Sequence, residues 1–207
     1  AGTRSNLQIE ATVLKYNFLV LCLLFWIPVA AVSLWRPDLR RAMRRAALCA
    51  LPFAFSEVLF YPDYWAPTFL FDLGHRLGFG LEDFLFVSAL GANAVSIYGV
   101  LSFRTYAPSE RHLPARSLLT RVLSIFALVL VLVLFAAMLG IPMIYGCMAI
   151  MLLVGAVLMV GRRDLFLPAL VSSLGLAVLY WLLAAVYDWL YPGIFRTIWH
   201  TQVLLNV

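Results

Sequence analysis

Long apolar stretches divide this 207-residue chain and constrain its fold more than any other feature. There are six of them, at residues 16–35, 46–61, 81–103, 119–139, 142–160 and 165–190. A helix needs about 20 apolar residues to cross the hydrocarbon core of a bilayer. Hydrophobic residues make up 64% of the chain and charged residues 12%, whereas soluble domains carry about 25% charged residues. The sequence predicts an all-α integral membrane protein, with six transmembrane helices in a single membrane domain over residues 1–207.

Several other classes of protein and site are excluded by the same residues. The first stretch is longer than the hydrophobic region of a signal peptide, and WRPDLRR follows it where a small-residue cleavage site would stand, so it is interpreted as a retained span. Cys22, Cys49 and Cys147 lie in apolar stretches without a CxxC motif, which predicts small buried residues and no metal site or other cofactor. No basic run is interleaved with aromatics, so no nucleic-acid partner is expected.

Arginines gather in alternate loops between the apolar stretches. Arg36, Arg40, Arg41, Arg44 and Arg45 follow the first stretch, Arg104, Arg111, Arg116 and Arg121 follow the third, and Arg162 and Arg163 follow the fifth. Because basic loops stay on the cytoplasmic side, this alternation predicts a protein of the cytoplasmic (inner) membrane. The Arg-rich loops are then cytoplasmic and the N-terminus lies outside.

Acidic residues fall on the opposite, outer side of this predicted topology. They are Glu57, Asp63, Asp72, Glu82, Asp83 and Asp188. Ionisable groups at membrane depth indicate a functional site by default, because hydrocarbon penalises an unpaired charge. Glu82 and Asp83 open the apolar run FLFVSAL, and for them a functional role is favoured. The first turn of a helix also stabilises negative charge. For Asp72, a position in a solvated loop is favoured.

Two pairs of short matching segments in the sequence indicate an internal repeat. RPDL at 36–39 matches RRDL at 162–165, and YPDYWAP at 61–67 matches YDWLYPG at 187–193. Both copies run the same way through the membrane, which predicts a parallel three-helix repeat.

The predicted repeat divides the chain into repeat 1 (about 16–103), a connector helix (about 119–139) and partial repeat 2 (about 142–207). The third helix of the second copy, a seventh in all, would begin where this sequence stops. Either that helix follows Val207 in a longer chain, or the second copy lacks it.

Two motifs resemble the membrane lycopene cyclase domain of bacteria, archaea and fungi: DYW at 63–65, followed by a glycine-containing loop, and GLEDFLF at 80–86. That family is built from two three-helix copies, each with an Asp-containing exit and a Pro-x-Glu-Glu-x-x-Phe-Phe motif. Glu82 and Asp83 match the acidic pair, and Phe86 matches one aromatic. This chain departs from the pattern with Asp at the second acid, with Gly80 in place of the proline, and with no second acidic pair in view.

The resemblance implies a carotenoid or isoprenoid cyclase or isomerase that works without flavin. Cyclising a polyene needs a proton donor, a stabilised cation and a proton acceptor, and two adjacent carboxyl groups can divide into an acid and a base. Glu82 and Asp83 are therefore predicted to be catalytic, with Asp63 as a third partner. Neighbours on a helix point about 100° apart, so we expect Glu82 in the pocket and Asp83 to orient or bind Arg76. The predicted substrate-binding residues are Glu57, Tyr61, Tyr64, Trp65, Arg76, Phe84, Phe86 and Asp188.

Two other functions stay open. One is a non-catalytic membrane subunit of a larger complex that retains a lipid- or carotenoid-binding groove, which the incomplete second copy favours. The other is a small transporter or proton path that uses Glu57 and the outer acids, although no broken helix pair or gating motif stands out. The expected partners are membrane lipid, a hydrophobic isoprenoid or carotenoid, and, in the subunit reading, a partner membrane subunit.

Small and aromatic residues give two further expectations. SALGANAVSIYG at 88–99 has small residues at roughly four-residue spacing, which predicts close helix packing. Trp35, Tyr191 and Trp199 are predicted to anchor the chain at the membrane interfaces, where Trp and Tyr are enriched.

Overall fold

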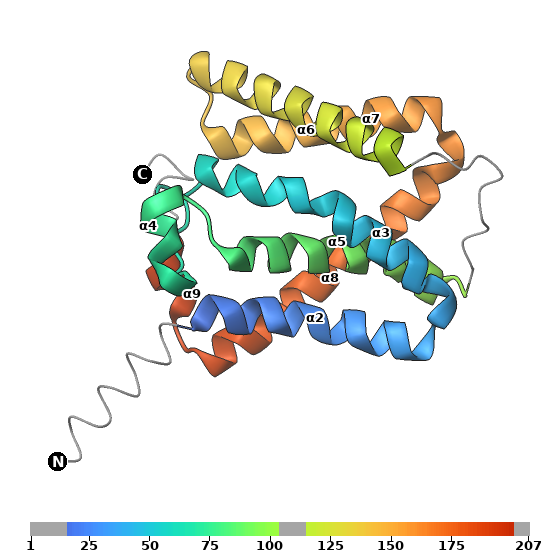
Figure 1. The fold of residues 1–207 in the computed structure, drawn as a ribbon, viewed down its shortest axis with the longest axis horizontal. Coiled ribbons are helices and arrows are strands. Elements are labelled where there is room, and N and C mark those ends of the chain that lie inside the picture. The colour runs from blue at the N-terminus through green and yellow to red at the C-terminus, as the bar shows by residue number, and fades with distance from the viewer. Residues whose placement is uncertain (1–15, 104–114, 201–207) are drawn as a thin grey trace.

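The computed structural model describes residues 16–103 and 115–200, and this part of the chain is helical without strands (Figure 1). Its elements are α2 (Asn17–Trp35), η1 (Pro37–Leu39), α3 (Arg40–Ala50), η2 (Leu51–Leu59), η3 (Leu70–Asp72), α4 (Leu73–Leu77), α5 (Leu81–Leu101), α6 (Ala115–Met138), α7 (Met143–Gly161), η4 (Arg163–Leu165), α8 (Phe166–Leu190) and α9 (Ile194–Ile198). Among these, α2, α5, α6, α7 and α8 are long and apolar enough to cross a membrane. The predicted all-α class is confirmed, and these five helices suggest a membrane protein.

The second predicted span, 46–61, differs from the prediction because it is not one α-helix. α3 begins already at Arg40 and passes directly into the 3₁₀ segment η2 at Leu51. Pro52 has no backbone N–H to donate and crowds the preceding turn, which accounts for the change of helix type there. Five full-length helices therefore qualify as candidate spans, and the second predicted span is a composite of α and 3₁₀ turns.

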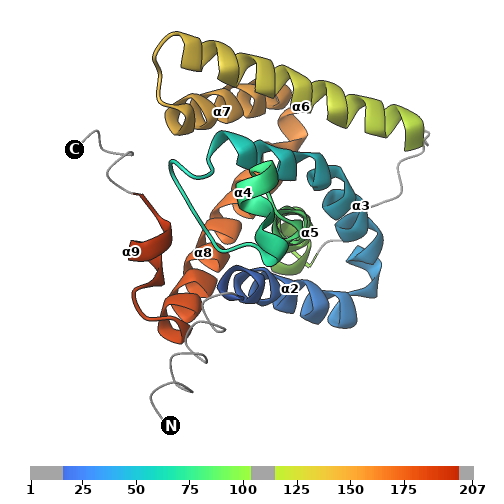
Figure 2. The same ribbon diagram turned by 60° about the vertical axis from the view of Figure 1, so that its left-hand side comes forward.

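The central helix is α5, which packs against α2, α3, η2 and α8 (Figure 2). The small residues predicted to allow close packing do so: Ser88, Ala89, Ala92, Asn93, Ser96 and Gly99 are buried. A Cβ added to Gly91 would lie 2.8 Å from the backbone oxygen of Ala46, so α3 and α5 touch through their backbones. The Asn93 side-chain amide donates to the backbone oxygen of Phe25 at 3.0 Å and ties α5 to α2.

Two long helices, α6 and α7, form a hairpin at the edge of this core and touch it where α6 meets η2 (Figure 1). Their apolar side chains are largely uncovered, as Val131 at 63% and Leu152 at 74% exposure illustrate. On α8, Trp181 is 68% exposed. Large uncovered apolar faces of this kind are compatible with contact to membrane lipid.

The two ends of the helix bundle differ in charge. At the arginine end, which holds the turns 36–39 and 162–165, Arg36 pairs with Asp38 and Arg162 with Asp164, each at 2.8 Å. The hydrogen bonds from Arg36 lower the pKa of Asp38.

The opposite end carries α4, η3 and α9 (Figure 1), and we call it the acidic end. The predicted loop with Arg104 and Arg111 lies outside the described residues, as do the ranges 1–15 and 201–207.

Replacing Gly91 by Val tests the close packing of α3 on α5. The added carbons have no room beside the Ala46 carbonyl, so we expect a loss of about 1–3 kcal/mol in stability and a lower thermal midpoint in detergent, followed by circular dichroism. Gly155→Val on α7 is the matched control, because its added Cβ meets nothing within 4 Å. Equal losses in the two variants would contradict this packing.

Candidate functional site

The acidic end is closed by the chain segment between η2 and α5, and both members of the acidic pair hold this segment in place. The backbone N–H of Leu70 donates to Glu82 Oε1 at 2.6 Å, across twelve residues of chain. The backbone N–H of Gly80 donates to Asp83 Oδ2 at 2.7 Å, which caps the first turn of α5. The pair therefore has two different local roles: Glu82 holds the loop and Asp83 holds its own helix.

The loop is fitted tightly around the side chain of Phe69. A Cβ on Gly74 would lie 2.3 Å from this ring and a Cβ on Gly80 would lie 2.2 Å from it, so glycine is required at both positions. Phe71 and Asp72 have positive φ angles of 58° and 56°, a conformation that costs about 1–3 kcal/mol for each non-glycine residue. The bond to Glu82 at Leu70 stands directly beside this strained pair.

Glu82 points inward, as the sequence analysis expected. Its side chain is 1% exposed and that of Asp83 is 4% exposed. Glu82 Oε2 has no hydrogen-bond partner, although Oε1 is occupied by Leu70. The backbone oxygen of Glu82 accepts a hydrogen bond from the Cys22 thiol at 3.3 Å, which places the start of α5 against α2. One carboxyl oxygen is thus buried and available.

Buried polar atoms without partners are concentrated at this end of the described structure. They are Asn17 Oδ1, Glu57 Oε1, Glu82 Oε2, Tyr187 Oη and Trp199 Nε1. They come from the starts of α2 and α5 and from the ends of η2, α8 and α9. Each unsatisfied buried group costs about 1–3 kcal/mol, and such groups call for an explanation such as a bound molecule. Their common location marks a candidate binding site.

Glu57 belongs with the acidic pair. It lies within electrostatic reach of Asp83 and close to the Trp65 indole. The three residues Glu57, Glu82 and Asp83 are called the carboxylate cluster below. Cys22 lies within electrostatic reach of both Glu82 and Asp83.

Aromatic rings surround the carboxylate cluster. Phe18 packs edge-on against Trp65 at 5.1 Å and against Phe69 at 5.5 Å between ring centroids. Trp65 also packs on Trp199 at 5.2 Å, and the backbones of these two residues form an isolated antiparallel bridge. Trp199 was predicted to be an interfacial anchor. In the structure it joins the segment after α9 to the loop before α5, with its indole nitrogen buried, and its role as an interfacial anchor stays a prediction.

Not all predicted site residues meet here. Asp63, Asp188 and Arg76 are exposed, so the third carboxylate predicted at Asp63 is not part of the buried cluster. Asp83 makes no ion pair with Arg76 in the described chain, because its carboxylate is used by Gly80. Asp72 is exposed as expected, and its carboxylate lies 3.8 Å from His75.

The predicted aromatic residues separate into two groups. Phe86 lies on the same side of α5 as the carboxylate cluster, and its ring centroid is 6.1 Å from that of Phe18. Phe84 packs instead against Phe55 and Phe79, with 5.3 and 6.0 Å between the ring centroids.

The two predicted tyrosines also serve different ends of the loop. Tyr61 packs against Phe69 at 5.5 Å. The Tyr64 hydroxyl accepts a hydrogen bond from Met143 N at 3.1 Å and holds the start of α7. Only Tyr61 therefore contacts the rings around the carboxylate cluster directly.

Sequence reasoning did not select several residues of the site. They are Asn17, Phe18, Cys22, Phe69, Tyr187 and Trp199. Tyr187 opens YDWLYPG, the segment that matches YPDYWAP in the predicted repeat, and this match was the signal that could have indicated it. Asn17 is a polar residue at the start of the apolar stretch 16–35, and this position is the signal that could have indicated it.

No group of three or more His, Cys, Asp and Glu side chains in the described ranges could hold a metal ion. No protein-family model, curated protein or solved structure matches the chain. The resemblance to the membrane lycopene cyclases stays an expectation from the sequence.

Two tyrosine substitutions test whether the unpartnered atoms are free. Tyr187→Phe removes a buried hydroxyl that has no partner, so we expect thermal stability in detergent to stay equal or to rise. Tyr64→Phe is the matched change, and it should cost about 1 kcal/mol because it leaves the Met143 N–H unpaired. A larger loss from Tyr187→Phe than from Tyr64→Phe would contradict the assignment of a free hydroxyl.

Proposed function

We propose that this chain is a carotenoid- or isoprenoid-cyclase-like membrane protein, in which Glu82 delivers a proton to a carbon–carbon double bond of a polyene. The observation that carries the proposal is the buried, unpartnered Glu82 Oε2, which lies with the Phe69 ring beside Gly80. A soluble acid would lose such a proton to water, whereas a dry carboxyl group can give it to an apolar substrate.

The reaction is an isomerisation and balances without another reactant. The Glu82 proton adds to a terminal double bond, whose π electrons form the new C–H bond and leave a tertiary cation. An internal double bond then closes the ring through a new C–C bond and moves the cation. Loss of a proton from a neighbouring carbon restores a double bond. Substrate and product are isomers, so no oxidant, reductant or cofactor is required.

The remaining cluster residues take roles that follow from their contacts. Glu57, with an unpartnered oxygen, is the carboxyl group proposed to accept the proton. Asp83 positions Glu82 by capping α5. Phe18, Trp65 and Phe69 present aromatic faces or edges around the site, and aromatic faces attract cations.

The structure gives the departure from the family motif a physical reason. Gly80 stands where the lycopene cyclase pattern has proline. A proline could not donate the backbone N–H that Asp83 accepts, and any Cβ at this position would overlap the Phe69 ring.

The proposal includes the parallel repeat and the topology. The turns at Arg36–Asp38 and Arg162–Asp164 support the repeat, because in each an Arg–Asp pair spans the start of a three-residue 3₁₀ turn between two helices. The concentration of arginines at that end of the bundle supports its placement in the cytoplasm, with the acidic end outside the inner membrane.

A non-catalytic membrane subunit is the second candidate. The observation that favours it is that both acids of the pair make structural hydrogen bonds, to Leu70 and to Gly80. The uncovered apolar faces of α6 to α8 could then contact a partner subunit as well as lipid.

Glu82→Gln tests the catalytic proposal. Gln can still accept the Leu70 N–H bond but cannot donate an acidic proton, so we expect cyclised product in a polyene-accumulating host to fall at least about 100-fold. Asp188→Asn is the control, because Asp188 is an exposed acid at the same end, and it should leave product unchanged. Product would be measured by chromatography of extracted pigments, and unchanged product in Glu82→Gln would refute the role of Glu82.

The subunit candidate is tested by purification in mild detergent. It predicts that a second membrane protein copurifies with this chain in stoichiometric amount, as measured by size-exclusion chromatography and mass spectrometry. A chain that runs alone would exclude this candidate.

A further inference from the structure

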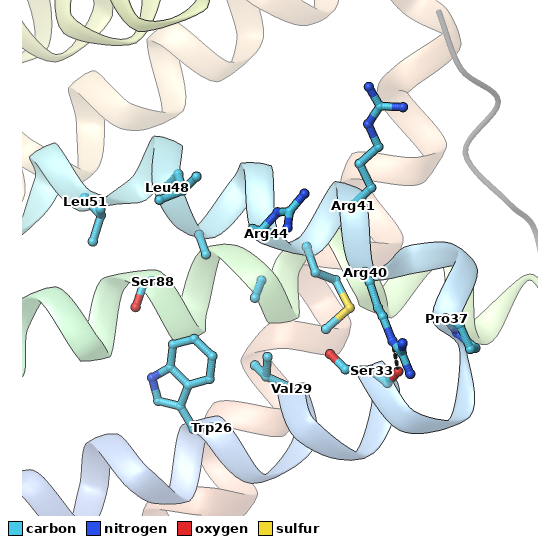
Figure 3. Close-up of a pocket in the computed structure, with 13 residues that line it drawn as sticks. Trp26, Val29, Ser33, Pro37, Arg40, Arg41, Arg44, Leu48, Leu51 and Ser88 are labelled. Atoms are coloured by element: carbon cyan, nitrogen blue, oxygen red, sulfur yellow. Dashed lines mark hydrogen bonds between the residues drawn. The ribbon is translucent and has the colours of Figure 1, made fainter. Parts of the chain in front are cut away.

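A cavity of about 690 Å³ lies between α2, α3 and α5 near the arginine end (Figure 3). Its size falls in the range of about 300–1,000 Å³ that is usual for small-molecule sites. Trp26, Val29 and Met43 line its apolar part, and Arg40, Arg41 and Arg44 line its other part. It is separate from the carboxylate cluster: its lining residue on α5 nearest to Glu82 is Ser88, about 9 Å further along the helix axis.

The charge of this cavity has one sign, because its lining holds three arginines and no carboxylate. Arg40 reaches across to α2, where its Nε donates to the backbone oxygen of Ser33 at 2.6 Å (Figure 3). Arg41 and Arg44 make no ion pair within the described chain, since the nearby acid Asp38 is held by Arg36. Positive charge at the cavity is therefore not neutralised by the described side chains.

The apolar part is equally well defined. Trp26 extends from α2 into the space below α3 (Figure 3), and its indole N–H is satisfied by the backbone oxygen of Leu85 at 3.0 Å. The ring thus presents hydrocarbon to the cavity and needs no polar partner there. A soluble anion alone would leave this part empty, and a neutral lipid would leave the arginines uncompensated.

We propose that the cavity binds an anionic phospholipid, with one acyl chain along Trp26 and Val29 and the phosphate at Arg40 and Arg44. These two arginines are four residues apart, so they lie on one face of α3. Basic pockets between transmembrane helices bind anionic lipid headgroups by the same combination of charge and apolar depth. The lipid joins α2 to α3 beside the central helix. This proposal does not rest on the cyclase activity.

The test uses quenching of Trp26 fluorescence by phospholipids with brominated acyl chains, with the whole protein in lipid nanodiscs. The Trp26 signal is the difference between the wild-type protein and Trp26→Phe. We expect brominated phosphatidylglycerol to quench this signal at a mole fraction at least tenfold lower than brominated phosphatidylcholine. Equal quenching by the two lipids would overturn the proposal.

Arginine variants identify the headgroup site. Arg40→Gln combined with Arg44→Gln should raise the phosphatidylglycerol fraction needed for half-quenching at least tenfold. Arg45→Gln, an exposed arginine on the same helix outside the lining, should change it less than twofold. Equal effects of the double variant and of Arg45→Gln would mean that the whole basic surface attracts the anionic lipid, and would overturn the proposed headgroup site. Relief of quenching by added inorganic phosphate would overturn the lipid as occupant.

Discussion

One hydrogen bond, from the Leu70 N–H to Glu82 Oε1, joins the loop at the acidic end to the central helix. Glu82 lies in the first turn of α5, and α5 is the helix that packs against α2, α3, η2 and α8. The bond therefore fixes the loop relative to the helical core, although Phe71 and Asp72 in that loop have strained backbone angles. The Phe69 ring, one residue before Leu70, is placed between Gly74 and Gly80 and closes the space above the carboxyl group.

The membrane supplies the second constraint. Apolar faces on α6, α7 and α8 are uncovered, so charged groups are confined to the ends of the bundle and to buried positions between helices. At the arginine end, Arg36 and Arg162 are paired with Asp38 and Asp164. At the acidic end the cost of charge is met by backbone donors from the loop and from Gly80. The carboxylate cluster is thus tolerated without a cationic partner in the described chain.

The sequence predicts the helical elements well because apolar length is a local property. The bounds of α2, α7 and α8 lie within one or two residues of the stretches read from the sequence. The composite α3–η2 was missed because Pro52 stands inside an apolar run that hides the change of helix type. Inward burial of Glu82 was predictable from its position at the start of α5, since an acid beside an apolar run must find partners.

The membership of the site was harder to predict, because it depends on contacts between distant segments. Trp199 and Trp65 form a backbone bridge although more than a hundred residues separate them in the sequence. No local sequence pattern predicts this contact. Asp63 and Asp188 were selected from the DYW motif and its match in the predicted repeat, yet both are exposed. Tyr187 precedes Asp188 on α8 and is buried while Asp188 is exposed, because successive residues on a helix face different directions.

The most direct test of the central claim is amide hydrogen exchange at Leu70 in the wild-type protein and in Glu82→Ala. The account predicts that the Leu70 amide is protected in the wild type and exchanges at least about 100-fold faster without the carboxylate, while amides in the middle of α5 keep their protection. A Leu70 amide that exchanges at the same rate in both proteins would contradict the claim that Glu82 closes the acidic end.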